Sequence, residues 1–235
     1  MADQALITGA SRGIGRATAE RFRREGWRVM NVSRSPCTVP DVMNVEVDFS
    51  VPGWEAKLAP ALRDGPGVGQ GRLCVVHNAA AYEHDDALTM DADHLRRVLE
   101  VNIVAPLVLN RVVRPLLTEG SSLLYVGSTL AEKAVKGVAS YVTTKHALVG
   151  MMRATCQDLA GTGIHTACVC PGFTSTEMLR AHLGSDAAAL AMVEGKTTFG
   201  RLIAPEEIAD VLFTCATTPV LNGALIHANL GQVET

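Results

Sequence analysis

Short apolar segments alternate with longer amphipathic ones along the whole chain. Each apolar segment is five to seven residues long and rich in Val, Ile and Leu. A continuous apolar run of this length is typical of a strand that is buried on both faces. The segments that predict strands are residues 4–8, 27–33, 45–49, 72–77, 122–128, 164–170 and 224–229.

Amphipathic helical patterns separate these segments. Strand and helix in alternation predict an α/β fold, in which a doubly wound parallel sheet has helices on both faces. No Pro/Ser-rich linker divides the chain, so we expect a single domain over residues 1–235. Residues 173–200 are rich in Ala and contain no strand pattern, which predicts a small helical lid. The helical patterns cover residues 14–25, 53–64, 92–117, 139–160 and 205–216.

A glycine-rich turn connects the first predicted strand to the first predicted helix, in the sequence TGASRGIG (8–15). Such a turn brings backbone N–H groups and the positive end of a helix towards a diphosphate. Glycine also lets the phosphate approach the backbone closely. The spacing is G-x-x-x-G-x-G and not the more familiar G-x-G-x-x-G, and an ordinary strand–helix turn is the alternative interpretation.

Tyr141 precedes Lys145 by one helical turn in the segment SYVTTKHALVG (140–150). Residues four apart share one face of a helix, so the phenol and the ammonium point the same way. Two unit charges about 4 Å apart at an effective dielectric of about 20 interact by roughly 4 kcal/mol, which is worth up to about three pKa units. We therefore expect Lys145 to lower the pKa of Tyr141 towards neutrality. A surface contact without catalytic meaning is the alternative.

Composition and charge exclude several classes of function. The net charge is −3 with both signs spread along the chain, so no nucleic-acid surface is expected. No apolar run approaches the ~20 residues of a membrane span, and the first ten residues do not resemble a signal peptide. The six cysteines suggest neither a disulfide framework nor a metal site, so we expect reduced thiols and a cytoplasmic protein.

Eight short stretches resemble the motifs of the classical short-chain dehydrogenases/reductases, in the order in which that family has them. The resemblance spans nearly the whole chain and is closest to the NADP-dependent 3-oxoacyl and carbonyl reductases. It implies a Rossmann-like domain with a seven-stranded parallel sheet, and an oxidoreductase that transfers a hydride between a nicotinamide cofactor and a ketone or secondary alcohol. The matching stretches are TGASRGIG (8–15), VDFS (47–50), HNAA (77–80), VN (101–102), GS (127–128), YVTTK (141–145), PGFTST (171–176) and GRLIAPEEIA (200–209).

The resemblance assigns the catalytic roles. It implies that Tyr141 protonates the substrate oxygen, that Ser128 hydrogen-bonds the same oxygen, and that Lys145 also binds the nicotinamide ribose. Asn102 would hold a water molecule beside the lysine for proton relay; the alternative is that it satisfies a helix irregularity. Thr129 is the neighbouring hydroxyl that could be mistaken for Ser128.

The cofactor contacts are likewise implied by the resemblance. Asp48 matches the aspartate that binds the adenine amine, at the expected end of the third strand. The sequence departs from the usual N-N-A-G at His77-Asn78-Ala79-Ala80, where Ala80 replaces glycine; we interpret His77 as structural. The expected cofactor-binding residues are Gly9, Ser11, Arg12, Gly13, Ile14, Gly15, Ser33, Arg34, Asp48, Asn78, Ala79, Tyr141, Lys145, Pro171, Gly172 and Thr176.

The residues after the second strand favour NADP(H), with NAD(H) as the alternative. Enzymes that select NAD carry an acid there to bind the ribose 2′-hydroxyl. This chain has Ser33 and Arg34 and no acid before Asp41. Arg34, Arg12 and the Ser33 hydroxyl could bind a 2′-phosphate through charge-assisted hydrogen bonds.

The expected substrate is a small carbonyl or alcohol compound. In 3-oxoacyl-[acyl carrier protein] reductases two arginines dock the acidic carrier, and the matching places here fall near Glu119 and Thr162, neither of them basic. The alternatives are a 3-oxoacyl reductase, an NAD-dependent alcohol dehydrogenase, an epimerase or isomerase, and a non-catalytic cofactor-binding protein. Helical segments 96–117 and 139–160 are apolar on more than one face, which predicts a homo-oligomer, either a tetramer or a dimer.

Overall fold

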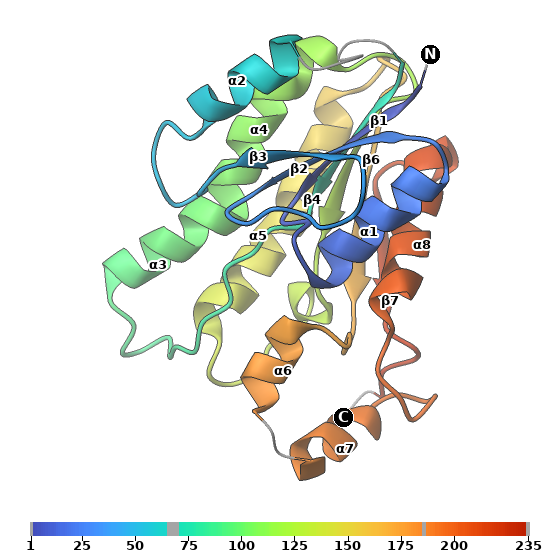
Figure 1. Cartoon of the computed structure of the whole chain (residues 1–235). Coiled ribbons are helices and arrows are strands. Elements are labelled where there is room, and N and C mark those ends of the chain that lie inside the picture. Colours follow the sequence, from blue (N-terminus) through green and yellow to red (C-terminus); the bar gives the residue numbers. More distant parts are fainter. Residues whose placement is uncertain (1, 65–70, 185–186, 234–235) are drawn as a thin grey trace.

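The predicted parallel sheet is present. In the computed structural model, which describes residues 2–64, 71–184 and 187–233, the sheet has seven parallel strands in the order β3-β2-β1-β4-β5-β6-β7 (Figure 1). The order reverses between β1 and β4, and in such sheets ligands bind beside the carboxyl ends of the strands at this point. The strands are β1 (Gln4–Thr8), β2 (Arg28–Ser33), β3 (Val42–Glu46), β4 (Leu73–His77), β5 (Ser122–Val126), β6 (His165–Pro171) and β7 (Ala224–Ala228).

Strand β3 lies earlier in the chain than its apolar pattern predicted. It pairs with β2 from Val42 to Glu46, whereas the predicted segment was 45–49. Val47 and Phe49 are buried, but they pack from the turn that follows the strand. Asp48 therefore lies beyond the strand, in a turn in which its carboxylate accepts hydrogen bonds from the backbone N–H and the hydroxyl of Ser50.

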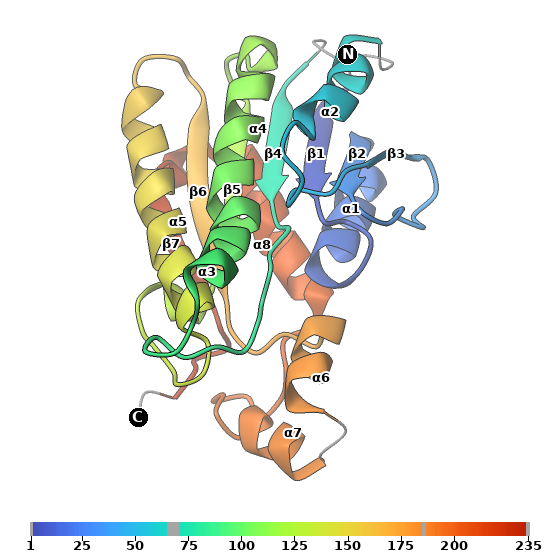
Figure 2. The same ribbon diagram turned by 90° about the vertical axis from the view of Figure 1, so that its left-hand side faces the viewer.

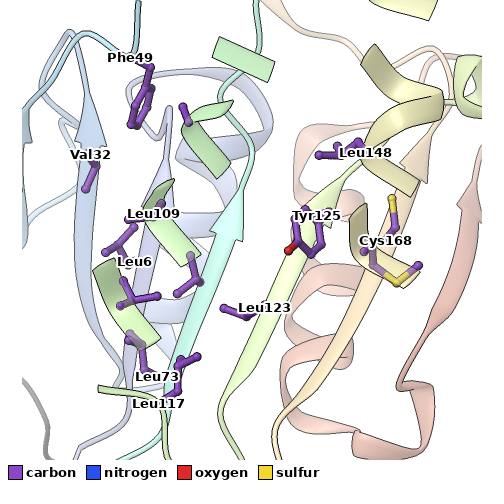
Figure 3. Close-up of a cluster of buried hydrophobic side chains, with 14 of the residues drawn as sticks. Leu6, Val32, Phe49, Leu73, Leu109, Leu117, Leu123, Tyr125, Leu148 and Cys168 are labelled. Atoms are coloured by element: carbon purple, nitrogen blue, oxygen red, sulfur yellow. The ribbon is translucent and has the colours of Figure 1, made fainter. Parts of the chain in front are cut away.

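Alternate residues of the strands pack into two separate cores, one on each face of the sheet. Ala5 and Ile7 point towards α1 (Gly13–Arg24) and α8 (Pro205–Thr217). Leu6 points the other way, towards the layer formed by α2 (Glu55–Asp64), α4 (Ala105–Val113) and α5 (Ala139–Asp158). Figure 2 shows α2, α4 and α5 side by side on this face, and Figure 3 shows part of its core. Successive side chains of a strand point to opposite faces, and both faces of this sheet are covered by helices, so the residues on both faces of a strand are mostly apolar.

The long helix predicted over residues 92–117 is interrupted. It consists of α3 (Ala92–Leu99), a π-helical turn η1 (Glu100–Val104), α4 and a short 3₁₀ turn η2 (Arg114–Leu116). Pro106 has no N–H to donate to the carbonyl of Asn102, so a regular α-helical ladder cannot continue there. Instead, the N–H of Ala105 donates to the carbonyl of Glu100, five residues back. Single π-helical turns of this kind are frequent at functional sites.

The predicted helical insertion consists of two short helices, α6 (Glu177–Leu183) and α7 (Ala187–Glu194). They project beyond the carboxyl ends of the strands, at the bottom of Figures 1 and 2. No helix in the described ranges is long and apolar enough to cross a membrane.

Candidate active site

The glycine turn needs glycines because two of them have positive φ angles and all three pack closely against other parts of the protein. Gly9 and Gly13 have positive φ angles of 70° and 53°. A Cβ atom on Gly15 would lie 2.3 Å from the carbonyl oxygen of Gly9 and 2.5 Å from the Asn78 amide nitrogen. Arg12 precedes α1 without a side-chain cap, so the first N–H groups of the helix remain available. This cradle fits a diphosphate.

The other predicted residues of the turn divide between the surface and the core. Ser11 is partly buried in the turn, and Arg12 is exposed beside it. The side chain of Ile14 is partly buried and packs against the core on the α1 face.

Asn78 ties the end of β4 to the end of β1 at the switch point of the sheet. Its side-chain amide donates to the carbonyl oxygens of Thr8 (2.9 Å) and Gly9 (3.1 Å). The hydroxyl of Thr8 accepts from the backbone N–H groups of Asn78 (2.9 Å) and Ala79 (3.0 Å). The backbone of Ala80 does not have a positive φ, so alanine is accommodated without strain where the family usually has glycine.

The structure brings Ser128, Tyr141 and Lys145 together. Ser128 follows β5, and its hydroxyl accepts from the N–H of Leu130 (3.1 Å). Tyr141 and Lys145 lie in the first two turns of α5 and are both buried. Ser128 lies near enough to Tyr141 to lower the pKa of the phenol. Two hydroxyl groups this close can both contact one substrate oxygen. Thr129, the alternative to Ser128, is buried at the start of a 3₁₀ turn, η3 (Thr129–Ala131).

The expected lowering of the Tyr141 pKa does not occur in this structure. Burial raises the pKa of Tyr141 to about 12, and the nearby Ser128 side chain only partly opposes this effect. Lys145 Nζ lies 5.3 Å from the centre of the Tyr141 ring, and its hydrogen bond goes to the carbonyl oxygen of Val126 (2.7 Å). Burial lowers the pKa of Lys145 to about 8. The i,i+4 spacing predicted the shared helix face, but it could not predict the hydrogen-bond partner of the flexible lysine side chain.

Asn102 lies in the π-helical turn η1, and its side chain bonds to protein groups. Its Oδ1 accepts from the N–H of Ala81 (2.7 Å), and its Nδ2 donates to the carbonyl of Ala81 (3.0 Å) and to Thr144 Oγ1 (3.0 Å). Thr144 in turn donates to the carbonyl of Tyr141 (2.9 Å). Asn102 therefore links the π-helical turn to the loop after β4 and to the turn that carries Tyr141. Its role in holding a relay water stays a prediction.

The predicted residues for the adenosine half of the cofactor lie beside the cradle. Arg12 and Arg34 are exposed. The carboxylate of Asp41, the first acid after β2, pairs with Arg23 (2.9 Å). Hydrogen bonds from Ser50 lower the pKa of Asp48, and the nearby charge of Arg34 lowers it further.

Ser33 and Thr176 also have partners within the protein. The hydroxyl of Ser33 is buried and donates to the carbonyl of Ser35 (2.6 Å), so binding a phosphate would require this bond to open. Thr176 caps α6, and its methyl group would lie 3.2 Å from a Cβ on Gly13. Pro171 ends β6, and Gly172 is packed so closely that a Cβ would lie 2.9 Å from that of Asn229.

Sequence reasoning missed two neighbours of Tyr141. The ring of Tyr82 meets that of Tyr141 edge to face, with centroids 4.8 Å apart. Asp85 accepts a hydrogen bond from the N–H of Ser140, the residue before Tyr141 (3.1 Å). Both lie in the loop after β4, far from α5 in sequence. No local pattern identifies such contacts, although a tyrosine and several acids after a strand end offer a weak signal.

Comparisons with known proteins agree with the fold and with the family resemblance seen in the sequence. Residues 69–231 match the family described as Enoyl-(Acyl carrier protein) reductase, and residues 3–46 match the family described as short chain dehydrogenase. The chain is 30% identical to the short-chain reductase protein NovJ of Streptomyces niveus, over 97% of this chain and 93% of NovJ. It is 28% identical to the 3-oxoacyl-[acyl-carrier-protein] reductase FabG of Escherichia coli (strain K12), over 97% of this chain and 96% of FabG.

Solved structures share the fold. A chain from Beutenbergia cavernae, whose structure holds NADP at low occupancy, superposes with a TM-score of 0.85 at 25% identity, over 97% of this chain and 95% of that one. The matched families span both the glycine turn and the segment with Ser128, Tyr141 and Lys145. This chain belongs to the short-chain dehydrogenase/reductase family of oxidoreductases, with the Rossmann-like fold of that family.

Proposed function

We propose that the protein transfers a hydride between NADP(H) and a small ketone or secondary alcohol, with Tyr141 as the general acid and base. The observation that carries this proposal is that Ser128, Tyr141 and Lys145 come together, with Tyr141 and Lys145 buried on successive turns of α5 and Lys145 Nζ 5.3 Å from the centre of the Tyr141 ring. A non-catalytic cofactor-binding protein has no need for this buried arrangement.

The residues can complete the reduction of a carbonyl without a metal ligand. When bound, NADP(H) supplies the hydride that the carbonyl carbon accepts. Ser128 hydrogen-bonds the carbonyl oxygen, and Tyr141 gives that oxygen its phenolic proton, so the C=O bond becomes CH–OH. The raised pKa of Tyr141 keeps the phenol protonated at neutral pH, so it holds the proton that reduction needs. In the oxidation direction Tyr141 must be present as phenolate to take the proton from the alcohol, and this requires its pKa to be lowered towards the working pH.

The cofactor preference is supported by charges beside the cradle. Arg34 and Arg12 are exposed and could face a 2′-phosphate, while the carboxylate of Asp41 is already paired with Arg23. The NADP in the Beutenbergia cavernae structure is compatible with this preference. Binding through Ser33 is the weaker part of the proposal because its hydroxyl is already hydrogen-bonded.

Arg34→Ala is expected to weaken NADPH binding by roughly 10- to 150-fold, because removing one partner of a charge-assisted contact costs about 1.5–3 kcal/mol. NADH binding should hardly change, since NADH has no phosphate at that position. The measurement is the ratio of kcat/KM for the two cofactors in wild type and variant. Arg24→Ala, in the last turn of α1, is the matched control. A wild type that prefers NADH, or a ratio that Arg34→Ala leaves unchanged, would show that these arginines are only solvated surface charges.

A 3-oxoacyl thioester reductase is the second candidate, favoured by the likeness to FabG along the whole chain. The structure offers little support for an acidic carrier. Glu119 packs against Gly163, next to Thr162, so a carboxylate lies where the carrier-docking arginines would be expected. A panel of ketones, alcohols and 3-oxoacyl thioesters, followed at the NADPH absorbance band with NADH in parallel, separates the two candidates. Turnover confined to thioesters would favour the second.

We also propose that the protein forms a homo-oligomer, a tetramer or a dimer, through α4 and α5. Leu107 on α4 is 58% exposed in the single chain, and most residues of α4 are apolar. An exposed large apolar side chain on such a helix fits a contact with a second copy. Light scattering at micromolar concentration should give a multiple of 24.9 kDa, and the mass of one chain would contradict this prediction.

A further inference from the structure

A carboxylate from a distant loop caps the helix that carries Tyr141. Helix α5 begins after Val138, whose side chain cannot accept a hydrogen bond. Asp85, from the loop after β4, takes this place: its Oδ1 accepts from the N–H of Ser140 (3.1 Å), and its Oδ2 accepts from the Ser140 hydroxyl. Negative charge is favourable at a helix N-terminus, where the first N–H groups have no partner within the helix. Ser140 is directly followed by Tyr141.

The carboxylate is buried and held from two sides. The side chain of Asp85 is 4% exposed, and His94 Nε2 lies 3.0 Å from its Oδ2. The other ring nitrogen of His94 lies 3.4 Å from Glu83 Oε2. Burial alone would raise the pKa of Asp85, but the hydrogen bonds from Ser140 and His94 outweigh it, so the pKa lies below its usual value. The carboxylate is therefore ionised at neutral pH.

The same cluster joins the segments that carry the predicted catalytic residues. The backbone N–H of Asp85 donates to the carbonyl of Gly137 (3.0 Å), on the segment between Ser128 and α5. His94 lies on α3, which continues directly into the π-helical turn with Asn102. Asp85 thus contacts both the start of α5 and the helix that leads to Asn102, although its own side chain does not touch the phenol.

We propose that Asp85 is a positioning residue for catalysis: its carboxylate, oriented by His94, fixes the first turn of α5 and so holds the Tyr141 phenol against Ser128. This inference rests on the proposed role of Tyr141 as acid and base. A purely structural cap is the competing explanation, and it differs in what it predicts: loss of stability without a specific loss of turnover.

Asp85→Ala is expected to lower kcat by about 10- to 100-fold, the order expected when a reacting group is displaced by about 1 Å. The Kd of NADPH, measured by fluorescence titration, should stay within about threefold, because Asp85 lies apart from the glycine cradle. Asp85→Asn keeps one acceptor for the N–H of Ser140 but places an NH₂ group near Ser140 or His94, so its kcat should lie between those of wild type and Asp85→Ala. Asp86→Ala is the matched control, since Asp86 is exposed on the same loop and caps only Leu88.

A second control separates positioning from general destabilisation. Asp3→Ala removes a carboxylate that binds Arg72 near the start of β1, at the end of the sheet away from Tyr141. It should lower the melting temperature and leave kcat near that of wild type. The inference would be overturned if Asp85→Ala had the same kcat as Asp86→Ala. It would also be overturned if the fall in kcat were no larger than that of an Asp3→Ala protein with the same loss of stability. If Tyr141→Phe also retained normal turnover, the proposed function would fail; if only the Asp85 variants did so, the inference alone would fail.

Discussion

Replacing Tyr141 with phenylalanine is expected to lower kcat by roughly two to four orders of magnitude, the usual contribution of a positioned acid–base group. The substitution removes one oxygen and keeps the ring, so the edge-to-face contact with Tyr82 and the burial of the side chain can persist. NADPH binding should stay nearly intact, because the glycine cradle does not involve the phenol. Steady-state kinetics and a fluorescence titration of NADPH measure the two effects separately.

Tyr82→Phe is the matched control for Tyr141→Phe. Both rings lie in contact, and burial raises the pKa of Tyr82 to about 12, as it does for Tyr141. Ser128 lowers the pKa of the Tyr141 phenol, and Tyr141 is the proposed proton donor, so the loss of the Tyr82 hydroxyl should change kcat far less. Normal turnover by Tyr141→Phe together with a large loss of turnover in Tyr82→Phe would show that Tyr141 is not the residue that transfers the proton.

Local sequence patterns were sufficient to predict the parallel sheet and the glycine turn between β1 and α1. Strands buried on both faces leave a continuous apolar signal, and a turn that approaches a diphosphate needs glycine at fixed positions. The same local signal misplaced β3, because Val47 and Phe49 are buried from a turn as deeply as strand residues are. It also missed the interruption at η1, since amphipathic periodicity continues through a single π-helical turn.

The sequence predicted which residues lie together at the site better than it predicted their hydrogen bonds and pKa values. The spacing of Tyr141 and Lys145 predicted the shared helix face, and Lys145 Nζ lies over the Tyr141 ring, but its hydrogen bond goes to the carbonyl of Val126. Burial, which depends on the whole fold, then raises the pKa of Tyr141. The contact of Asp85 with Ser140 joins residues 55 positions apart, so no short-range rule could find it.

The backbone of the glycine turn should tolerate no side chain at Gly15. An alanine Cβ would lie 2.3 Å from the carbonyl oxygen of Gly9 and 2.5 Å from the Asn78 amide, and neither group can move freely, because Asn78 Nδ2 already holds the carbonyls of Thr8 and Gly9. Overpacking of this kind costs about 1–3 kcal/mol or more. For a chain of this size, that cost corresponds to a fall in melting temperature of about 2–12 °C.

Gly15→Ala should also weaken NADPH binding by at least about tenfold, because relief of the clash displaces the N–H groups that face the diphosphate. Thermal unfolding and a fluorescence titration of NADPH measure the two effects. Glu20→Ala, at an exposed position on the same helix, should leave both within the small range usual for surface substitutions. A Gly15→Ala protein with the stability and the NADPH affinity of wild type would mean that the turn is not the diphosphate site. Reduced stability with unchanged affinity would likewise place the cofactor elsewhere, since the cradle cannot shift around a new methyl group and still present the same N–H groups.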